Sequence, residues 1–289
     1  MTEGILLSLL AATAYGLLGV SYELAAKRRY GIWDVVSYMQ LTGLVIGAVI
    51  SALLGLPFFN IRLLAIGFLG AATFVGSIAC YLKASQERDI GANWTIVNLS
   101  VILPILFSIL WFHDTFTAAK ASAIVFTILS ILIIGGGFKG AAGGEYPFRW
   151  AKYIALAFFL NAWLPTLLRF VPEHYSALFT TYLYAIGFLL VQGYKLLWDR
   201  HWPAEAGLIK VSMSAAATHW SGIMLTMAAL TVVGRVSSEA GIIVYPITNG
   251  LVIPVGVLLG VWLLKERINR RTKIGIALAV AALVFLSIG

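Results

Sequence analysis

The chain has 289 residues, of which 61% are hydrophobic and only 11% are charged, whereas soluble globular domains carry about 25% charged residues. This composition excludes a soluble enzyme or binding domain. The formal net charge is +8, but the basic residues gather at the ends of apolar blocks, which favours membrane orientation over nucleic-acid binding. The single cysteine, Cys80, excludes an internal disulfide and a cysteine-based metal cluster.

Apolar blocks follow one another along the whole chain, and each is about 20 residues long, the length of a helix that crosses a ~30 Å hydrocarbon core. The blocks lack the alternating pattern of barrel strands, and only helices and barrels satisfy their backbone in lipid. The sequence therefore predicts an all-α, polytopic membrane protein with ten transmembrane helices. These helices are expected at 4–25, 33–55, 61–85, 90–112, 118–137, 151–171, 175–198, 207–232, 237–263 and 271–288. We interpret the first as a retained helix, because it has neither a basic leader segment nor a small-residue cleavage site.

Three short motifs of the first five blocks recur in the same order in the last five. The pairs are Ala71–Ile78 with Ala216–Ile223, Asn98–Pro104 with Asn249–Pro254, and Trp111–Thr117 with Trp262–Asn269. The recurrence indicates a duplication, and because five is an odd number the second copy enters the membrane in the opposite direction. We expect a 5+5 inverted repeat with three parts: 1–137 as the first repeat, 138–150 as a glycine-rich loop and 151–289 as the second repeat.

Alternate loops differ in their basic residues. Sixteen Lys and Arg residues follow the odd-numbered helices, and the other loops carry only Arg62, Lys120, Arg169 and Arg235. The basic loops are expected in the cytoplasm, which places both termini outside. The predicted location is the cytoplasmic membrane of a bacterium.

The motif Trp262–Asn269, followed by Gly275-Ile276-Ala277-Leu278, resembles the end of an EamA-type domain of the drug/metabolite transporter superfamily. The first half repeats the pattern less faithfully, with Asp114 at the acidic position. The resemblance implies a ten-helix carrier of small metabolites with a central cavity between its halves. Members of that family are usually drawn with cytoplasmic termini, but for orientation we follow the loop charges.

Polar and aromatic residues lie near the middle of predicted helices one, three, four, six, eight and nine, the helices that line the cavity in the resembled family. An amide or imidazole facing lipid costs several kcal/mol, so such groups face the interior or a wet cavity. The candidate substrate-binding residues are Tyr15, Phe74, Asn98, Asn161, Trp163, His219, Trp220 and Asn249. Two structural alternatives remain open. The asparagines would only link helices, at ~0.6 kcal/mol each, and a neutral His219 would donate to a backbone carbonyl instead of titrating near neutrality.

Three prolines are candidates for gating kinks, because proline bends a helix and frees a carbonyl. They are Pro104, Pro246 and Pro254; lipid-facing bends are the alternative. The sequence contains no Walker loop and no HExxH motif. We therefore expect no cofactor, metal or catalytic residue.

These patterns predict a secondary transporter or facilitator, not an enzyme, that moves a small metabolite by alternating access through a central cavity. The aromatic and amide side chains favour an amino acid or a similar zwitterionic, neutral or cationic solute. The alternatives are a flippase for a lipid-linked amphiphile, and a non-transporting membrane enzyme or scaffold. The expected partners are the solute and the lipid bilayer, without nucleic acid, and we expect the chain to act as a monomer.

Overall fold

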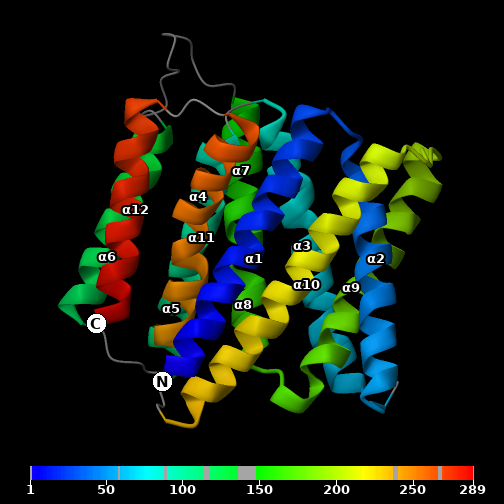
Figure 1. The fold of residues 1–289 in the computed structure, drawn as a ribbon, viewed down its shortest axis with the longest axis horizontal. Coiled ribbons are helices and arrows are strands. Elements are labelled where there is room, and N and C mark those ends of the chain that lie inside the picture. The colour runs from blue at the N-terminus through cyan, green and yellow to red at the C-terminus, as the bar shows by residue number, and fades with distance from the viewer. Residues whose placement is uncertain are drawn as a thin grey trace.

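The computed structural model describes residues 2–57, 59–87, 90–112, 117–135, 148–236, 240–265 and 269–288. Regular structure within these ranges is helical throughout, so the predicted all-α class is confirmed (Figure 1). The α-helices are α1 (Thr2–Lys27), α2 (Ile32–Leu53), α3 (Ile61–Ser85), α4 (Ile90–Asn98), α5 (Ile102–Phe112), α6 (Ala118–Gly135), α7 (Phe148–Asn161), α8 (Trp163–Leu168), α9 (Ser176–Tyr194), α10 (Ala206–Gly234), α11 (Ala240–Leu264) and α12 (Arg270–Ile288). Most of the predicted 138–150 loop and the acidic position Asp114 lie outside the described residues.

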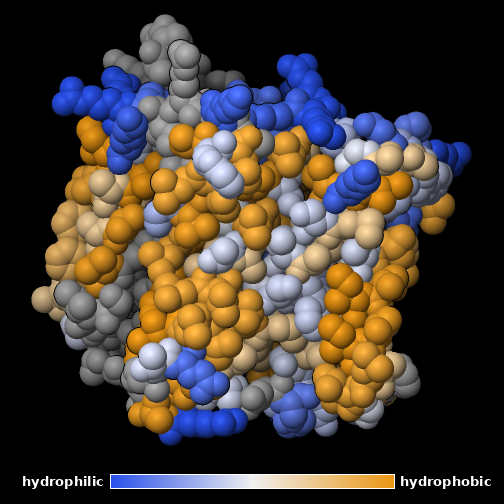
Figure 2. Space-filling model, in the orientation of Figure 1, coloured by the Kyte–Doolittle hydropathy of each residue, from blue (hydrophilic) through white to orange (hydrophobic). Residues whose placement is uncertain are grey.

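Seven spans in the described part of the chain are apolar and long enough to cross a membrane. They are Thr2–Lys27, Ile32–Leu53, Ile61–Ser85, Phe148–Leu168, Ser176–Asp199, Ala206–Gly234 and Ile243–Leu263. Apolar side chains cover a broad band of the surface, and hydrophilic residues gather along the upper rim, with a smaller group at the lower end (Figure 2). This distribution is that of a multi-pass membrane protein.

Two of the predicted helices are interrupted. The helix predicted at 90–112 changes from α4 to α5 through the 3-10 turn η1 (Leu99–Val101), and the helix predicted at 151–171 is divided at Ala162 between α7 and α8. A π-helical turn, η4 (Lys195–Asp199), extends α9. The other predicted helices begin and end within a few residues of observed ones.

Helices that are far apart in the sequence lie side by side. α1 packs along α10 and α11, α3 packs against α7 and α9, and the pairs α2–α9 and α6–α12 stand on opposite sides of the molecule (Figure 1). Helices from the first half of the chain therefore pack mainly against helices from the second half. α1 begins and α12 ends at the side opposite the hydrophilic upper rim.

A buried ion pair joins α2 to the end of α9. The ammonium of Lys195 contacts the carboxylate of Asp34, and the Lys195 side chain is 1% exposed. Asp199 lies 3.4 Å from the same nitrogen, and the indole ring of Trp202 lies 5.7 Å from it. Lys195 is one of the basic loop residues counted for orientation, and the structure shows that it is also an interhelical contact. Removing one partner would leave a buried charge uncompensated, which is strongly destabilising.

Close packing of α2 on α9 depends on two glycines. A Cβ added at Gly43 would lie 2.2 Å from the Tyr184 ring, and one added at Gly47 would lie 2.6 Å from the hydroxyl of Thr181. Small residues of this kind let helices in membranes approach closely. Because Gly43 has no side chain, the Tyr184 ring can lie directly against α2. In this position its hydroxyl reaches His219 of α10.

We expect Gly43→Ala to destabilise the protein by about 1–3 kcal/mol, because the new methyl group overlaps the buried Tyr184 ring. Thermal unfolding of the purified protein in detergent measures the effect. Gly193→Ala is the matched control, since a Cβ at Gly193 in α9 meets nothing within 4 Å. Equal melting temperatures for the two variants would contradict the packing described for α2 and α9.

Candidate substrate-binding cavity

A cavity of about 80 Å³ lies among α1, α3, α4, α7, α8, α10 and α11. Its lining carries aromatic, amide, imidazole and aliphatic side chains, and no Asp, Glu, Lys or Arg among the described lining residues. The lining consists of Tyr15, Leu18, Tyr22, Phe74, Ser77, Ile78, Tyr81, Trp94, Val97, Asn98, Asn161, Leu164, Pro165, His219 and Asn249. Six predicted site residues are thus brought together: Tyr15, Phe74, Asn98, Asn161, His219 and Asn249.

The two predicted tryptophans do not line this cavity. Trp163 begins α8 directly after the turn at Ala162 and is 45% exposed. Trp220 is 9% exposed and is buried elsewhere in the helix packing. Consecutive residues of an α-helix point about 100° apart, so Trp220 cannot share the direction of its neighbour His219, which faces the cavity.

His219 of α10 is held between aromatic rings. Its imidazole stacks on Phe74 with ring centroids 4.2 Å apart and an angle of 9° between the planes. Its Nδ1 lies 2.7 Å from the hydroxyl of Tyr184. The hydrogen-bond partner is therefore a tyrosine of α9, not the backbone carbonyl of the structural alternative. Tyr184 is itself buried and orients the imidazole from behind the cavity wall.

The side-chain amide nitrogens of the three cavity asparagines are all hydrogen-bonded. Nδ2 of Asn98 donates to the carbonyl of Trp94 (2.8 Å), and Nδ2 of Asn249 donates to the carbonyl of Tyr245 (3.2 Å), in each case four residues earlier in the same helix. Nδ2 of Asn161 instead reaches α4 and η1, where its partners are the carbonyl of Val97 (3.3 Å) and the hydroxyl of Ser100 (3.0 Å). Asn161 thus links two helices as the structural alternative proposed, and it also lines the cavity.

The two helix interruptions adjoin the cavity and have the same cause. Proline lacks an N–H and clashes with the carbonyl four residues earlier. Pro104 has this relation to Ser100, which lies in η1, and Pro165 has it to Asn161, the last residue of α7. The hydrogen bond between Asn161 and Ser100 joins the two interruptions. The sequence drew attention to Pro104 but not to Pro165.

The other two predicted kink prolines lie in α11, which runs without interruption over Ala240–Leu264. Pro246 and Pro254 are therefore accommodated inside a continuous helix. Gating by Pro104, Pro246 and Pro254 stays a prediction.

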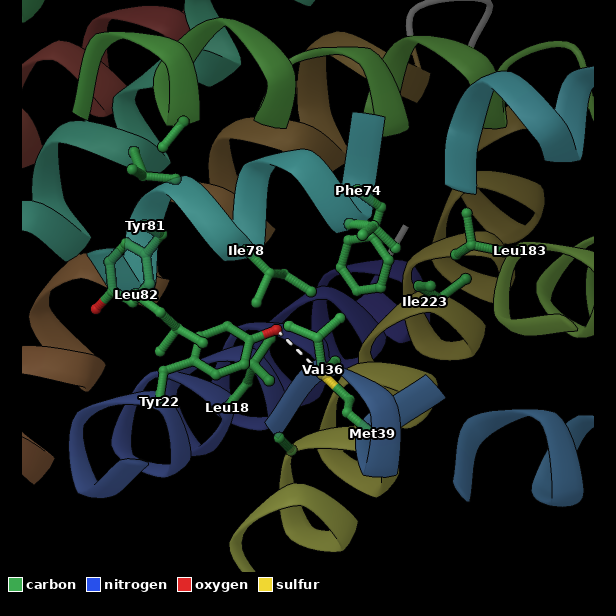
Figure 3. Close-up of a cluster of buried hydrophobic side chains, with 14 of the residues drawn as sticks. Leu18, Tyr22, Val36, Met39, Phe74, Ile78, Tyr81, Leu82, Leu183 and Ile223 are labelled. Atoms are coloured by element: carbon green, nitrogen blue, oxygen red, sulfur yellow. Dashed lines mark hydrogen bonds between the residues drawn. The ribbon is translucent and has the colours of Figure 1, made fainter. Parts of the chain in front are cut away.

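Three aromatic residues that the sequence did not single out also line the cavity. We call Tyr22, Tyr81 and Trp94 the aromatic cap. Their ring centroids are 5.6 to 6.3 Å apart, and all three are buried. Figure 3 shows Tyr22 and Tyr81 at one end of the buried cluster and Phe74 at the other, with Ile78 between them. The hydroxyl of Tyr22 donates to the sulfur of Met39 at 3.4 Å, which is the dashed line in Figure 3.

Helical spacing could have identified the aromatic cap. Tyr22 lies seven residues after Tyr15, Tyr81 lies seven after Phe74, and Trp94 lies four before Asn98. Positions four and seven residues apart share one face of a helix. Extending each predicted site residue along its own face would therefore have found all three.

Comparison with known proteins gives a family for the first half of the chain. The model of the EamA-like transporter family matches residues 2–136. Among solved structures, 28 chains match the fold. One crystal structure among them is 16% identical in sequence, covers 98% of this chain and 98% of its own, and superposes with a TM-score of 0.63. This similarity shows a shared fold alone. None of the curated proteins compared with the chain matches it significantly in sequence. The predicted family is thus confirmed for residues 2–136, which form a domain of the EamA-like transporter family.

Proposed function

We propose that the chain is a secondary carrier or facilitator that moves a small metabolite across the membrane by alternating access through this cavity. The observation that carries the proposal is the uncharged lining of aromatic and amide groups, among the described residues, in a multi-pass membrane protein with an EamA-like transporter domain. Polar groups at this depth are costly and mark substrate pathways. Apolar walls with a few placed polar groups are typical of small-molecule sites.

We also propose the 5+5 inverted repeat, with 1–137 and 151–289 as its halves. Phe74 and His219 occupy equivalent positions in the first repeated motif, and their rings stack on one another. Residues related by a twofold axis contact each other only near that axis, so this stacking supports a pseudo-twofold axis through the cavity. The equivalent residues Asn98 and Asn249 also make the same bond, to the carbonyl four residues earlier.

Helix packing gives the repeat independent support. The pairs α2–α9, α4–α11 and α6–α12 each join a predicted segment to the one five places later. The hydroxyl of Ser130 donates to the carbonyl of Gly275 at 2.7 Å and so joins α6 to α12. Because the halves interlock, the bodies that move during transport would each contain helices of both halves.

The cavity is smaller than the roughly 300 Å³ at which small-molecule sites usually begin. At about 80 Å³ it has room for a few water molecules. We propose that it is a contracted conformation, and that the aromatic cap separates when the cavity opens toward the hydrophilic rim.

A flippase is less well supported, because a lipid headgroup with a phosphate requires basic partners and the described lining has none.

Uptake into proteoliposomes tests the transport function. Purified full-length protein is screened against amino acids, nucleosides, sugars and amines, and uptake of at least one class above empty liposomes is expected. With that solute, Asn249→Ala is expected to lower kcat/KM about tenfold, because loss of one net hydrogen bond costs about 1–1.5 kcal/mol. Trp163→Ala, in the exposed tryptophan, is the control and should transport normally. Equal loss in the two variants, or unchanged transport in both, would remove the cavity as the site.

We propose that the basic rim is cytoplasmic and that both termini lie outside. Leu54 lies at the opposite end of α2 from that rim, whereas the exposed His201 belongs to the α9–α10 loop on the rim side. In a Cys80→Ala background, Leu54→Cys is expected to react with a membrane-impermeant maleimide in intact cells. His201→Cys is expected to react only after permeabilisation. The reverse pattern would invert the orientation.

A further inference from the structure

The orientation of each cavity amide is fixed by its hydrogen bonds. A backbone carbonyl can only accept a hydrogen bond, so the group that faces it must be the NH₂ of the amide. This holds for Asn98 beside the Trp94 carbonyl, for Asn249 beside the Tyr245 carbonyl and for Asn161 beside the Val97 carbonyl. Turning any of these amides over would set two oxygens against each other.

The three amide oxygens are consequently left for a ligand. Oδ1 of Asn98, Asn161 and Asn249 has no hydrogen-bond partner in the described parts of the chain, and all three residues line the cavity. An amide oxygen is an acceptor and offers no proton. The asparagines therefore present three acceptor oxygens to the cavity, while five of their six amide N–H groups are bonded within the described parts of the protein and one N–H of Asn98 is left over.

Two lining hydroxyls also donate to the protein, whereas the indole N–H of Trp94 has no hydrogen-bond partner in the described parts of the chain. The hydroxyl of Ser77 donates to the carbonyl of Ala157 at 3.2 Å, and that of Tyr22 donates to Met39. Nδ1 of His219 is occupied by Tyr184. The described lining thus sets three free amide oxygens, each with two lone pairs, against the free N–H groups of Trp94 and Asn98, together with several aromatic faces and no basic side chain.

A lining with more hydrogen-bond acceptors than donors favours one class of ligand. An organic cation is attracted to aromatic faces, and a primary ammonium also brings three N–H donors that can pair with amide oxygens. A quaternary ammonium has the same charge but no donor, so it would leave the acceptors dehydrated and unpaired. A carboxylate has only acceptors, so it would be repelled by the three amide oxygens and would have only the N–H groups of Trp94 and Asn98 as partners.

We propose that the cavity selects a primary organic ammonium ion, with N–H groups donated to the amide oxygens of Asn98, Asn161 and Asn249 and its apolar part held by the aromatic rings. The inference rests on the proposed transport function in taking this cavity as the substrate site. It narrows that function from neutral, zwitterionic or cationic solutes to amines.

Comparing the affinities of two cations of equal charge, only one of which has N–H groups, distinguishes recognition of N–H donors from electrostatic attraction alone. The probes are 2-phenylethylammonium and its N,N,N-trimethyl analogue, with 3-phenylpropionate as the anionic counterpart. Isothermal titration calorimetry on the purified full-length protein in detergent should show at least about tenfold tighter binding of the primary ammonium than of the trimethyl compound. Binding of 3-phenylpropionate should be weaker still. Equal or tighter binding of the trimethyl compound, or no binding of the primary ammonium at millimolar concentration, would overturn the inference.

Variants assign the selectivity to the amides. Asn249→Leu keeps a similar volume and removes the acceptor, so it should weaken binding of the primary ammonium about tenfold and leave the trimethyl compound unaffected. Asn98→Ala also removes an acceptor and provides a second, smaller replacement if the leucine variant does not fold, and Trp163→Ala is the control. A leucine or alanine variant at these asparagines that weakens both cations equally would contradict recognition through N–H donors.

Uptake by the same protein in liposomes distinguishes this inference from the transport function. Selective binding of the primary ammonium without any uptake would leave the inference standing and contradict transport. Uptake of solutes without preference for N–H donors would contradict the inference and leave transport standing.

Discussion

The structure depends on how amide and imidazole groups are accommodated halfway across a membrane. Each such group must find a partner, because hydrocarbon offers none. In this protein the amide nitrogens are bonded to backbone carbonyls, and the imidazole of His219 is bonded to Tyr184. The oxygens of the same amides are turned to a cavity enclosed by helices of both halves. Stability and the candidate binding site thus follow from the same side chains.

Non-helical backbone within the membrane also needs hydrogen-bond partners, and here other helices of the protein supply them. Non-helical backbone at membrane depth is tolerated only where protein or water covers it. The turn η1 before Pro104 and the break at Ala162 before Pro165 lie beside the cavity, and Asn161 supplies a donor to the Val97 carbonyl. Interlocking of the two halves makes this possible, because each interruption is covered by a helix from elsewhere in the chain.

The fold was largely predictable, because hydrophobic length and helix content are local properties of the sequence. Asn98, Asn161, His219 and Asn249 were expected from sequence to face the interior, because a polar side chain inside an apolar block avoids lipid, and they do line the cavity. Trp163 was expected in the cavity because it lies near the middle of its predicted helix, but it does not line the cavity. An aromatic ring is tolerated both in lipid and in a cavity, so depth in the membrane does not predict which way such a side chain faces. The contact between Lys195 and Asp34 was missed because both residues lie at segment ends, where charges are ordinarily solvated.

The central claim is that the lining asparagines face a hydrated cavity and not lipid. Thiol accessibility measures this directly, since water-soluble methanethiosulfonates react with hydrated thiols. In a Cys80→Ala background, Asn98→Cys is predicted to react with 2-aminoethyl methanethiosulfonate much faster than Val45→Cys, a position in the middle of α2 that is 55% exposed on the apolar surface. Reaction of Asn98→Cys at the rate of Val45→Cys, or no reaction at all, would contradict the account.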